Sequence, residues 1–176
     1  MISTRSLSLG FRAGSVFFLS FLLLGAGLKS GELVRSEAVT YRAEGLHFQK
    51  MGQLQDAPSA FQKAVEAYPR YSEAYNDLGV VLEALGNGTA AQAAYLLALQ
   101  IDPRFGAAYS NLAAFYEREG KIKEASVSWT ARVKMGPPAD PWVQKAVEKL
   151  KQYRFPLPVE EPRWRGYLRQ PLLELR

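Results

Sequence analysis

The feature that most constrains this chain is a pattern that returns at a constant interval through its central part. Aromatic, glycine, alanine and proline residues recur at this interval at seven positions, with no insertion between them. The matching sets are Tyr41, Tyr75 and Tyr109; Gly45, Gly79 and Ala113; Phe48, Leu82 and Tyr116; Gly52, Gly86 and Gly120; Ala57, Ala91 and Ala125; Phe61, Tyr95 and Trp129; and Pro69, Pro103 and Pro137. A fixed period of about 34 residues is typical of repeat architectures, in which each unit packs only on its neighbours.

Each unit has the pattern of two helices joined by a short turn. Apolar and small residues occur at helical spacing on one face of each predicted helix. In the second unit these residues are Tyr75, Leu78, Gly79 and Leu82, then Ala91, Tyr95 and Ala98. The Gly-Asn-Gly sequence at 86–88 predicts the turn, and Pro103 predicts the end of the second helix. One such hairpin leaves an apolar face uncovered, so we expect the units to stack.

The repeated motif resembles the tetratricopeptide repeat (TPR) family. The family pattern, aromatic-x2-Leu-Gly-x2-aromatic, then Ala-x3-aromatic, then Pro, is met at the positions quoted above in three tandem copies, residues 38–71, 72–105 and 106–139. The resemblance implies an all-α fold, an α-solenoid of three helical hairpins. Glu44 and Arg132 depart from the family pattern, and both lie in the outer copies.

The segment after the third copy predicts a capping helix over residues 140–153. Its apolar residues share one helical face: Trp142, Val143, Ala146, Val147 and Leu150. Asp140 is placed to cap this helix, with Pro141 in its first turn. Residues 154–176 form a tail rich in proline and aromatic residues. We expect a partly disordered end or a strap packed on the array. The alternatives are a short docking segment or a strap that occupies the protein's own groove.

Residues 1–30 read as a signal peptide or an N-terminal membrane anchor. Arg5 and Arg12 precede an uncharged run, residues 13–28, which as a helix would span about 24 Å. Either reading predicts an exported or membrane-anchored protein with the repeats outside the cytoplasm, in the periplasm, envelope or secretory lumen. Targeting to an organelle is the alternative.

The sequence shows no catalytic constellation and predicts a protein that is not an enzyme and has no cofactor or metal. It contains one histidine, His47, and no cysteine, which argues against a transition-metal site. From Glu32 onward 19 basic residues face 17 acidic ones, so no nucleic-acid partner is expected. Asn87 begins a glycosylation acceptor sequence, which the turn itself also explains.

The TPR resemblance implies that the first helices of the units line a concave groove for a peptide or a partner helix. Carrying the family's groove positions over gives Arg42, Leu46, Lys50, Glu73, Asn76, Asp77, Val80, Glu83, Ser110, Asn111, Ala114, Glu117 and Arg118, with Val39, Gln49 and Ala107 beside them. One subtype of the family clamps a C-terminal carboxylate, but Leu46 and Ala107 replace two of its polar residues. The acidic residues of the second copy favour a partner with basic character.

We therefore predict a non-enzymatic interaction scaffold or adaptor that binds an unidentified protein or peptide. A membrane partner is also predicted, through residues 13–28. The alternative is a self-assembling structural component of an envelope or organelle complex, with copies of the chain meeting as a homo-oligomer.

Overall fold

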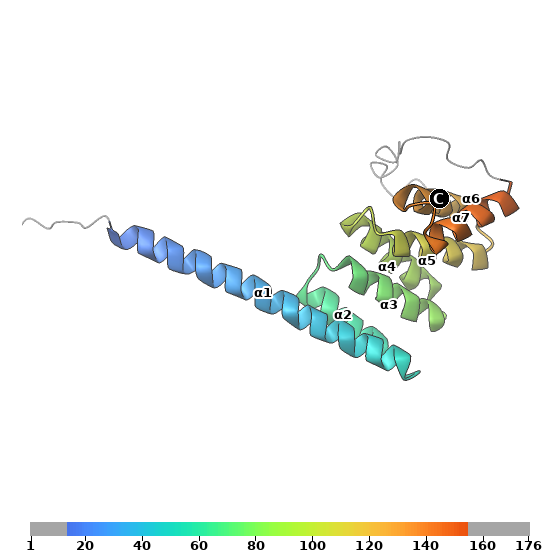
Figure 1. Cartoon of the computed structure of the whole chain (residues 1–176). Coiled ribbons are helices and arrows are strands. Elements are labelled where there is room, and N and C mark those ends of the chain that lie inside the picture. The colour runs from blue at the N-terminus through green and yellow to red at the C-terminus, as the bar shows by residue number, and fades with distance from the viewer. Residues whose placement is uncertain (1–13, 155–176) are drawn as a thin grey trace, which may run out of the picture.

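The computed structural model describes the backbone of residues 14–154 and the side chains of residues 31–154, and this part of the chain contains helices and no strands. The helices are α1 (Gly14–Lys50), α2 (Ala57–Ala67), α3 (Ser72–Ala84), α4 (Gly88–Ile101), α5 (Gly106–Arg118), α6 (Ile122–Met135) and α7 (Pro141–Gln152). They pack as the hairpins α1–α2, α3–α4 and α5–α6, which stack in series and finish with α7 (Figure 1). The predicted all-α solenoid of three hairpins with a capping helix is confirmed.

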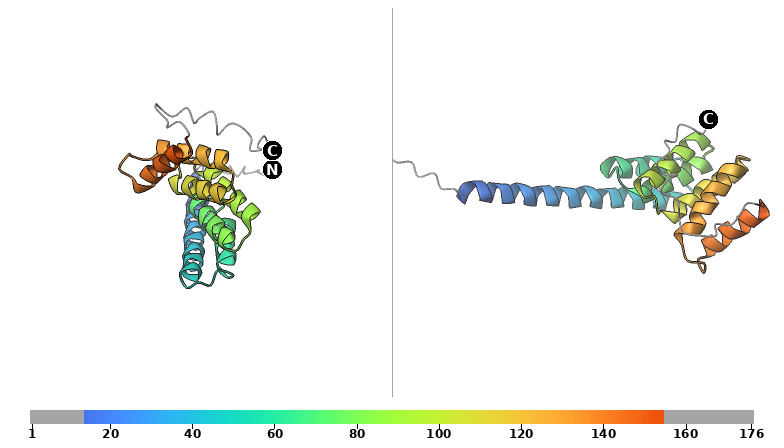
Figure 2. Two further views of the ribbon diagram at one scale, coloured as in Figure 1. Left: turned by 90° about the vertical axis from the view of Figure 1, so that its right-hand side faces the viewer. Right: turned by 90° about the horizontal axis from the view of Figure 1, so that it is seen from above.

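Helix α1 is much longer than the others, with 37 residues against 11 to 14. Its N-terminal half extends away from the stacked hairpins, and its C-terminal half packs on α2 (Figures 1 and 2). Within residues 31–154 no helix is long and apolar enough to cross a membrane. The side chains of the predicted targeting segment and the tail after Arg154 lie outside the described residues, so both readings remain predictions.

Glycine allows the two helices of a hairpin to approach closely. A Cβ atom on Gly79 would lie 2.7 Å from the ring of Tyr95, and one on Gly45 would lie 2.7 Å from the ring of Phe61. In these two units the aromatic side chain of the second helix occupies the space that the missing side chain leaves. Both aromatic residues are almost completely buried.

A glycine in the left-handed backbone region follows the first helix of each hairpin, two residues after the helix ends. The φ angles are +74° at Gly52, +79° at Gly86 and +70° at Gly120. This conformation is readily adopted by glycine and disfavoured for other residues. The predicted turn is thus confirmed, whereas Asp56 lies at the N-cap position of α2 without a capping hydrogen bond from its side chain.

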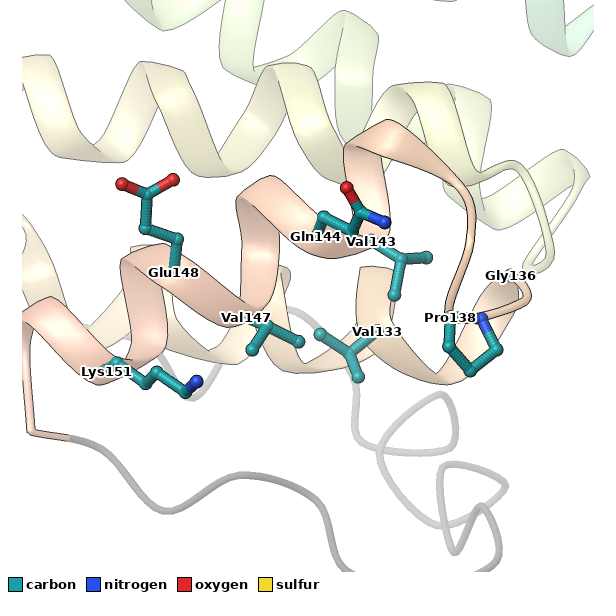
Figure 3. A pocket seen from close by; sticks show the side chains of 8 residues that line it. All are labelled: Val133, Gly136, Pro138, Val143, Gln144, Val147, Glu148 and Lys151. Carbon is teal, nitrogen blue, oxygen red and sulfur yellow. The ribbon is translucent and has the colours of Figure 1, made fainter.

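Helix α7 begins and packs largely as its sequence predicts. The Asp140 side chain accepts a hydrogen bond from the backbone N–H of Trp142 at 2.7 Å, and Val143 and Leu150 are buried. Trp142, which belongs to the same apolar face, is 51% exposed. The preceding helices cover only part of the apolar face of α7. Another part of this face, with Val143 and Val147, lines an open cavity of about 460 Å³ beside α6 (Figure 3).

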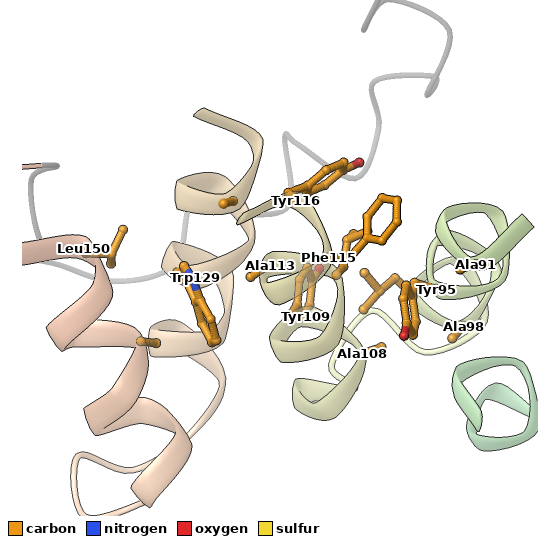
Figure 4. Close-up of a cluster of buried hydrophobic side chains, with 14 residues drawn as sticks. Ala91, Tyr95, Ala98, Ala108, Tyr109, Ala113, Phe115, Tyr116, Trp129 and Leu150 are labelled. Carbon is orange, nitrogen blue, oxygen red and sulfur yellow. The ribbon is translucent and has the colours of Figure 1, made fainter. Parts of the chain in front are cut away.

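One continuous apolar cluster joins α4 to α7 (Figure 4). Its large members come from successive helices, so each interface between them contains at least one aromatic ring. Full burial of such a side chain contributes about 1.5–3 kcal/mol. The cluster includes Tyr95, Leu99, Tyr109, Leu112, Phe115, Tyr116, Trp129 and Leu150.

Candidate binding surface on the first helices

The first helices α1, α3 and α5 are linked to one another by pairs of polar side chains. Arg42 Nε donates to Asp77 Oδ2 at 2.6 Å, between α1 and α3. Asn111 Nδ2 donates to Asn76 Oδ1 at 2.9 Å, between α5 and α3. A second bridge between these two helices pairs Arg118 with Glu83.

The partners in all three links are 35 residues apart, one more than the interval between equivalent residues of successive units. Arg42, for example, corresponds to Asn76 in the next unit but contacts the residue after it, Asp77. We call this set of links the inter-repeat ladder. Because it connects helices of different hairpins, it fixes how one unit is rotated against the next.

Two equivalent glutamates, Glu83 of the ladder and Glu117, connect the first helices to the second helices of their units. Tyr95 donates its hydroxyl hydrogen to Glu83 Oε2 at 2.8 Å, and Trp129 Nε1 donates to Glu117 Oε1 at 2.7 Å. The two glutamates are separated by one repeat interval, as are the two aromatic residues, so the same contact occurs in two successive units. Burial, with the Glu83 carboxylate adding to it, raises the pKa of Tyr95.

Glu117 also connects the last hairpin to α7. Its Oε2 accepts from Lys149 Nζ at 3.0 Å. Burial opposes ionisation of this carboxyl, but hydrogen bonds from Tyr153, Trp129 and Lys149 outweigh burial and lower the pKa of Glu117 below its usual range. Burial and the same carboxylate raise the pKa of Tyr153 to about 12.

The ladder neutralises most charges that the sequence assigns to the groove. Asp77 and Glu83 face Arg42 and Arg118, so the predicted acidic character of the second unit is largely cancelled. Burial raises the pKa of Asp77 even beside the Arg42 guanidinium. Both side chains of this pair are partly buried.

Apolar side chains lie beside the ladder in equivalent positions of the three units. Leu46 is 38% exposed, and Val80 and Ala114 are half-buried. Val39, about two turns before Leu46 on α1, is 49% exposed. We call Leu46, Val80 and Ala114 the apolar row; it offers solvent-accessible hydrophobic surface between side chains whose polar groups are already paired.

The remaining predicted groove residues divide into exposed and buried positions. Lys50 and Glu73 are exposed, and Glu73 Oε2 accepts from the hydroxyl of its neighbour Ser72 at 3.0 Å. Asn76 and Ser110 are buried, and the Ser110 hydroxyl donates to the Gly106 carbonyl at 3.3 Å. The structure therefore brings most of the predicted set to one surface and places these two beneath it.

The role of the glutamates was not anticipated from the sequence. The signal was present, because Glu83 and Glu117 share the repeat interval with Tyr95 and Trp129. The sequence places Lys149 on a basic face of α7, and its specific pairing with Glu117 emerges only from the structure. Within residues 31–154, no group of three or more histidine, aspartate or glutamate side chains is arranged to hold a metal ion.

Residues 42–104 match a family model described as tetratricopeptide repeat. The chain contains tandem TPRs. Comparison with curated proteins finds no match. The matched range includes the ladder pair Arg42 and Asp77 and both helices of the second unit.

Solved TPR domains have the same fold. The first TPR domain of Spaghetti (RPAP3), bound to the HSP90 peptide SRMEEVD, is 17% identical with a TM-score of 0.61, and the match covers 68% of this chain and 95% of that one. The TPR domain of Arabidopsis OM64 is also 17% identical, with a TM-score of 0.62 and coverage of 68% and 98%. The TPR2B domain of yeast Sti1, in a complex with pHsp70, is 20% identical with a TM-score of 0.60 and coverage of 66% and 98%.

Proposed function

We propose that this protein is a non-enzymatic interaction scaffold whose first helices bind a peptide or a partner helix. The observation that carries the proposal is the apolar row beside the inter-repeat ladder. Exposed apolar side chains rimmed by polar ones mark binding surfaces more often than isolated exposed residues do. The peptide complexes of Spaghetti and Sti1 support the choice of this kind of ligand.

The ion pairs on this surface indicate the net charge of the ligand. Arg42 and Arg118 already contact carboxylates, and Lys149 contacts Glu117. An acidic ligand would have to displace these intramolecular partners, which reduces its gain. We therefore propose a ligand with apolar anchors and little net charge, bound along Leu46, Val80 and Ala114.

A full-length selection experiment tests this proposal. Peptides are selected from a random display library against the full-length protein, and their affinities are measured by calorimetry. Leu46→Glu places a charge on the apolar row and should weaken binding at least about tenfold, equivalent to about 1.4 kcal/mol. The matched control is Val127→Glu, because Val127 is also an exposed apolar residue but lies on α6.

Two outcomes would contradict the proposal. One is equal affinity for the Leu46→Glu and Val127→Glu variants, which would place the ligand elsewhere. The other is a steep loss of affinity with added salt, which would show that charges dominate recognition. Circular dichroism of both variants confirms that each keeps its helical content.

We further propose that residues 1–30 anchor the scaffold in a membrane, with the repeats outside the cytoplasm. The backbone supports this proposal, because α1 runs without a break from Gly14 through the apolar run into the first hairpin. From Leu28 to Ala38, the first residue buried in the array, α1 rises about 15 Å. Intact mass of the native protein after fractionation tests it: an unprocessed chain in the membrane fraction is expected, and a chain lacking these residues contradicts it.

A further inference from the structure

Helix α7 ends in the same type of turn as the three first helices before it. The turn glycines Gly52, Gly86 and Gly120 are separated by the repeat interval, and the next position in this series is Arg154. Arg154 has a φ of +58°, although it is not a glycine. Its N–H donates to the Lys151 carbonyl at 3.0 Å, as that of Gly120 donates to Glu117 at 3.0 Å. Arg154 thus has the backbone region and the hydrogen bond of the glycines that follow the three first helices.

The side of α7 that would face a second helix is open. Val147 is equivalent to Gly45, Gly79 and Ala113. Gly45 and Gly79 face the aromatic residue of the second helix in their own units. In α7 this side borders the open cavity described above, where the lining is mostly apolar (Figure 3). The lining residues are Val133, Gly136, Pro138, Val143, Gln144, Val147, Glu148 and Lys151.

The residues after Arg154 continue the repeat in part. One repeat interval beyond the third unit, Val159 is equivalent to Ala125, Tyr167 to Val133 and Pro171 to Pro137. The aromatic position of the second helix, held by Phe61, Tyr95 and Trp129, is Arg163 here. Both members of the pair that meets across a hairpin therefore differ here, since Val147 replaces the small residue of α3 and Arg163 replaces the aromatic one of α4.

We propose that residues 162–170 pack into this cavity as the shortened second helix of a fourth, incomplete hairpin. Pro162 suits the first turn of a helix, and Pro171 follows where the second helices of the other units have ended. Nine helical residues rise about 13.5 Å, which fits alongside the 12 residues of α7. Trp164, Tyr167 and Leu168 share one face of this helix and supply the apolar side chains.

The position of the segment favours the same chain over a second copy. Lys151 lines the cavity three residues before Arg154, so the tail leaves α7 at the rim of the cavity. The eight residue-to-residue steps from Arg154 to Pro162 span up to about 26 Å when extended, which is enough to turn back. A segment tethered this closely has a high effective concentration at its site. Covering the cavity closes the end of the array without depending on the groove proposed above.

Disulfide trapping in the full-length protein tests the proposal, since the chain has no cysteine of its own. Val147→Cys with Arg163→Cys reproduces the pair Gly79 and Tyr95, which are in contact across a hairpin. We expect loss of both free thiols in a monomer under mild oxidation. Val147→Cys with Arg165→Cys is the matched control, because residue 165 is about 200° further around a helix and should keep its thiols free.

A second measurement does not depend on cysteine geometry. Tyr167→Ala should increase hydrogen exchange of the α7 amides, whereas Trp142→Ala, on the exposed edge of α7, should change it less. Disulfide-linked dimers in place of monomers would show that a second copy fills the cavity and would overturn the proposal. It would also be overturned by equal trapping of the two cysteine pairs, or by equal exchange in the two alanine variants.

Discussion

Replacement of Glu117 by glutamine tests the structural role of a residue that the sequence placed in the groove. The amide keeps an oxygen for Trp129 Nε1 but removes the charge that holds Lys149 and the acceptor that holds Tyr153. A hydrogen bond to a charged group contributes about 1.5–3 kcal/mol. Lys149 is partly solvated, with 29% of its side chain exposed, so we expect a loss near the lower value, about 1.5 kcal/mol.

Urea denaturation followed by circular dichroism measures this loss. For a typical urea dependence of about 1–3 kcal/mol per molar, the transition midpoint should fall by about 0.5–1.5 M. Hydrogen exchange should quicken about tenfold in α7 and less in α3, because Glu117 joins the last hairpin to α7. Units of a repeat protein unfold partly on their own, so this local comparison is as informative as the midpoint.

The effect of Glu117→Gln should also depend on pH. The pKa of Glu117 is lowered in the folded protein, so its carboxylate contributes stability above the unfolded pKa of about 4.3. That contribution is lost as the pH falls through the lower folded value. The difference in unfolding free energy between wild type and variant should therefore be largest near neutral pH and should narrow in acid.

Glu119→Gln is the matched control, because it removes the same charge two residues away from an exposed side chain. Its effect should stay within about 0.5 kcal/mol. Equal destabilisation by the two substitutions would refute the reasoning, since the cost would then follow from charge removal near the end of α5. The reasoning would also be refuted if the difference in unfolding free energy between wild type and Glu117→Gln did not change with pH.

Two further pairs of substitutions test the packing within a hairpin and the start of α7. Gly79→Ala should cost about 1–3 kcal/mol in urea denaturation, because the new methyl group meets the Tyr95 ring, whereas Gly31→Ala has no atom within 4 Å and should cause no loss. Asp140→Ala should lower the thermal midpoint more than Asp56→Ala, because the Asp140 side chain caps its helix and also pairs with Arg132, whereas the Asp56 side chain makes no capping hydrogen bond; equal shifts would contradict this.

The hairpins were predictable because the residues that form them act locally. Gly79 and Tyr95 belong to one unit, and their spacing recurs, so the pattern itself shows which residues must be small and which large. The turn at Gly86 was predictable for the same reason. Each of these features depends on contacts inside one hairpin, whose geometry the helical period determines.

The contacts between units were not predictable in the same way. The partners Asn76 and Asn111 are 35 residues apart, and that extra residue reflects the rotation of one hairpin against the next. No single unit contains this rotation. The exposure of Trp142 was not predictable for a related reason, since it depends on how far the neighbouring helices cover α7 and not on the apolar pattern of α7.

The ladder has a consequence for any study of ligand binding. Arg42 and Asn111 look like ligand contacts, but each also holds two hairpins together. Arg42→Ala would leave the partly buried Asp77 carboxylate without its cationic partner, so lost binding would not distinguish a missing contact from a rotated unit. Leu46 has an exposed side chain outside the ladder, so a change there alters the surface and leaves the stacking intact. Binding that survives Leu46→Glu and fails with Arg42→Ala would therefore locate the ligand on the ladder, or show that it requires the native rotation between units.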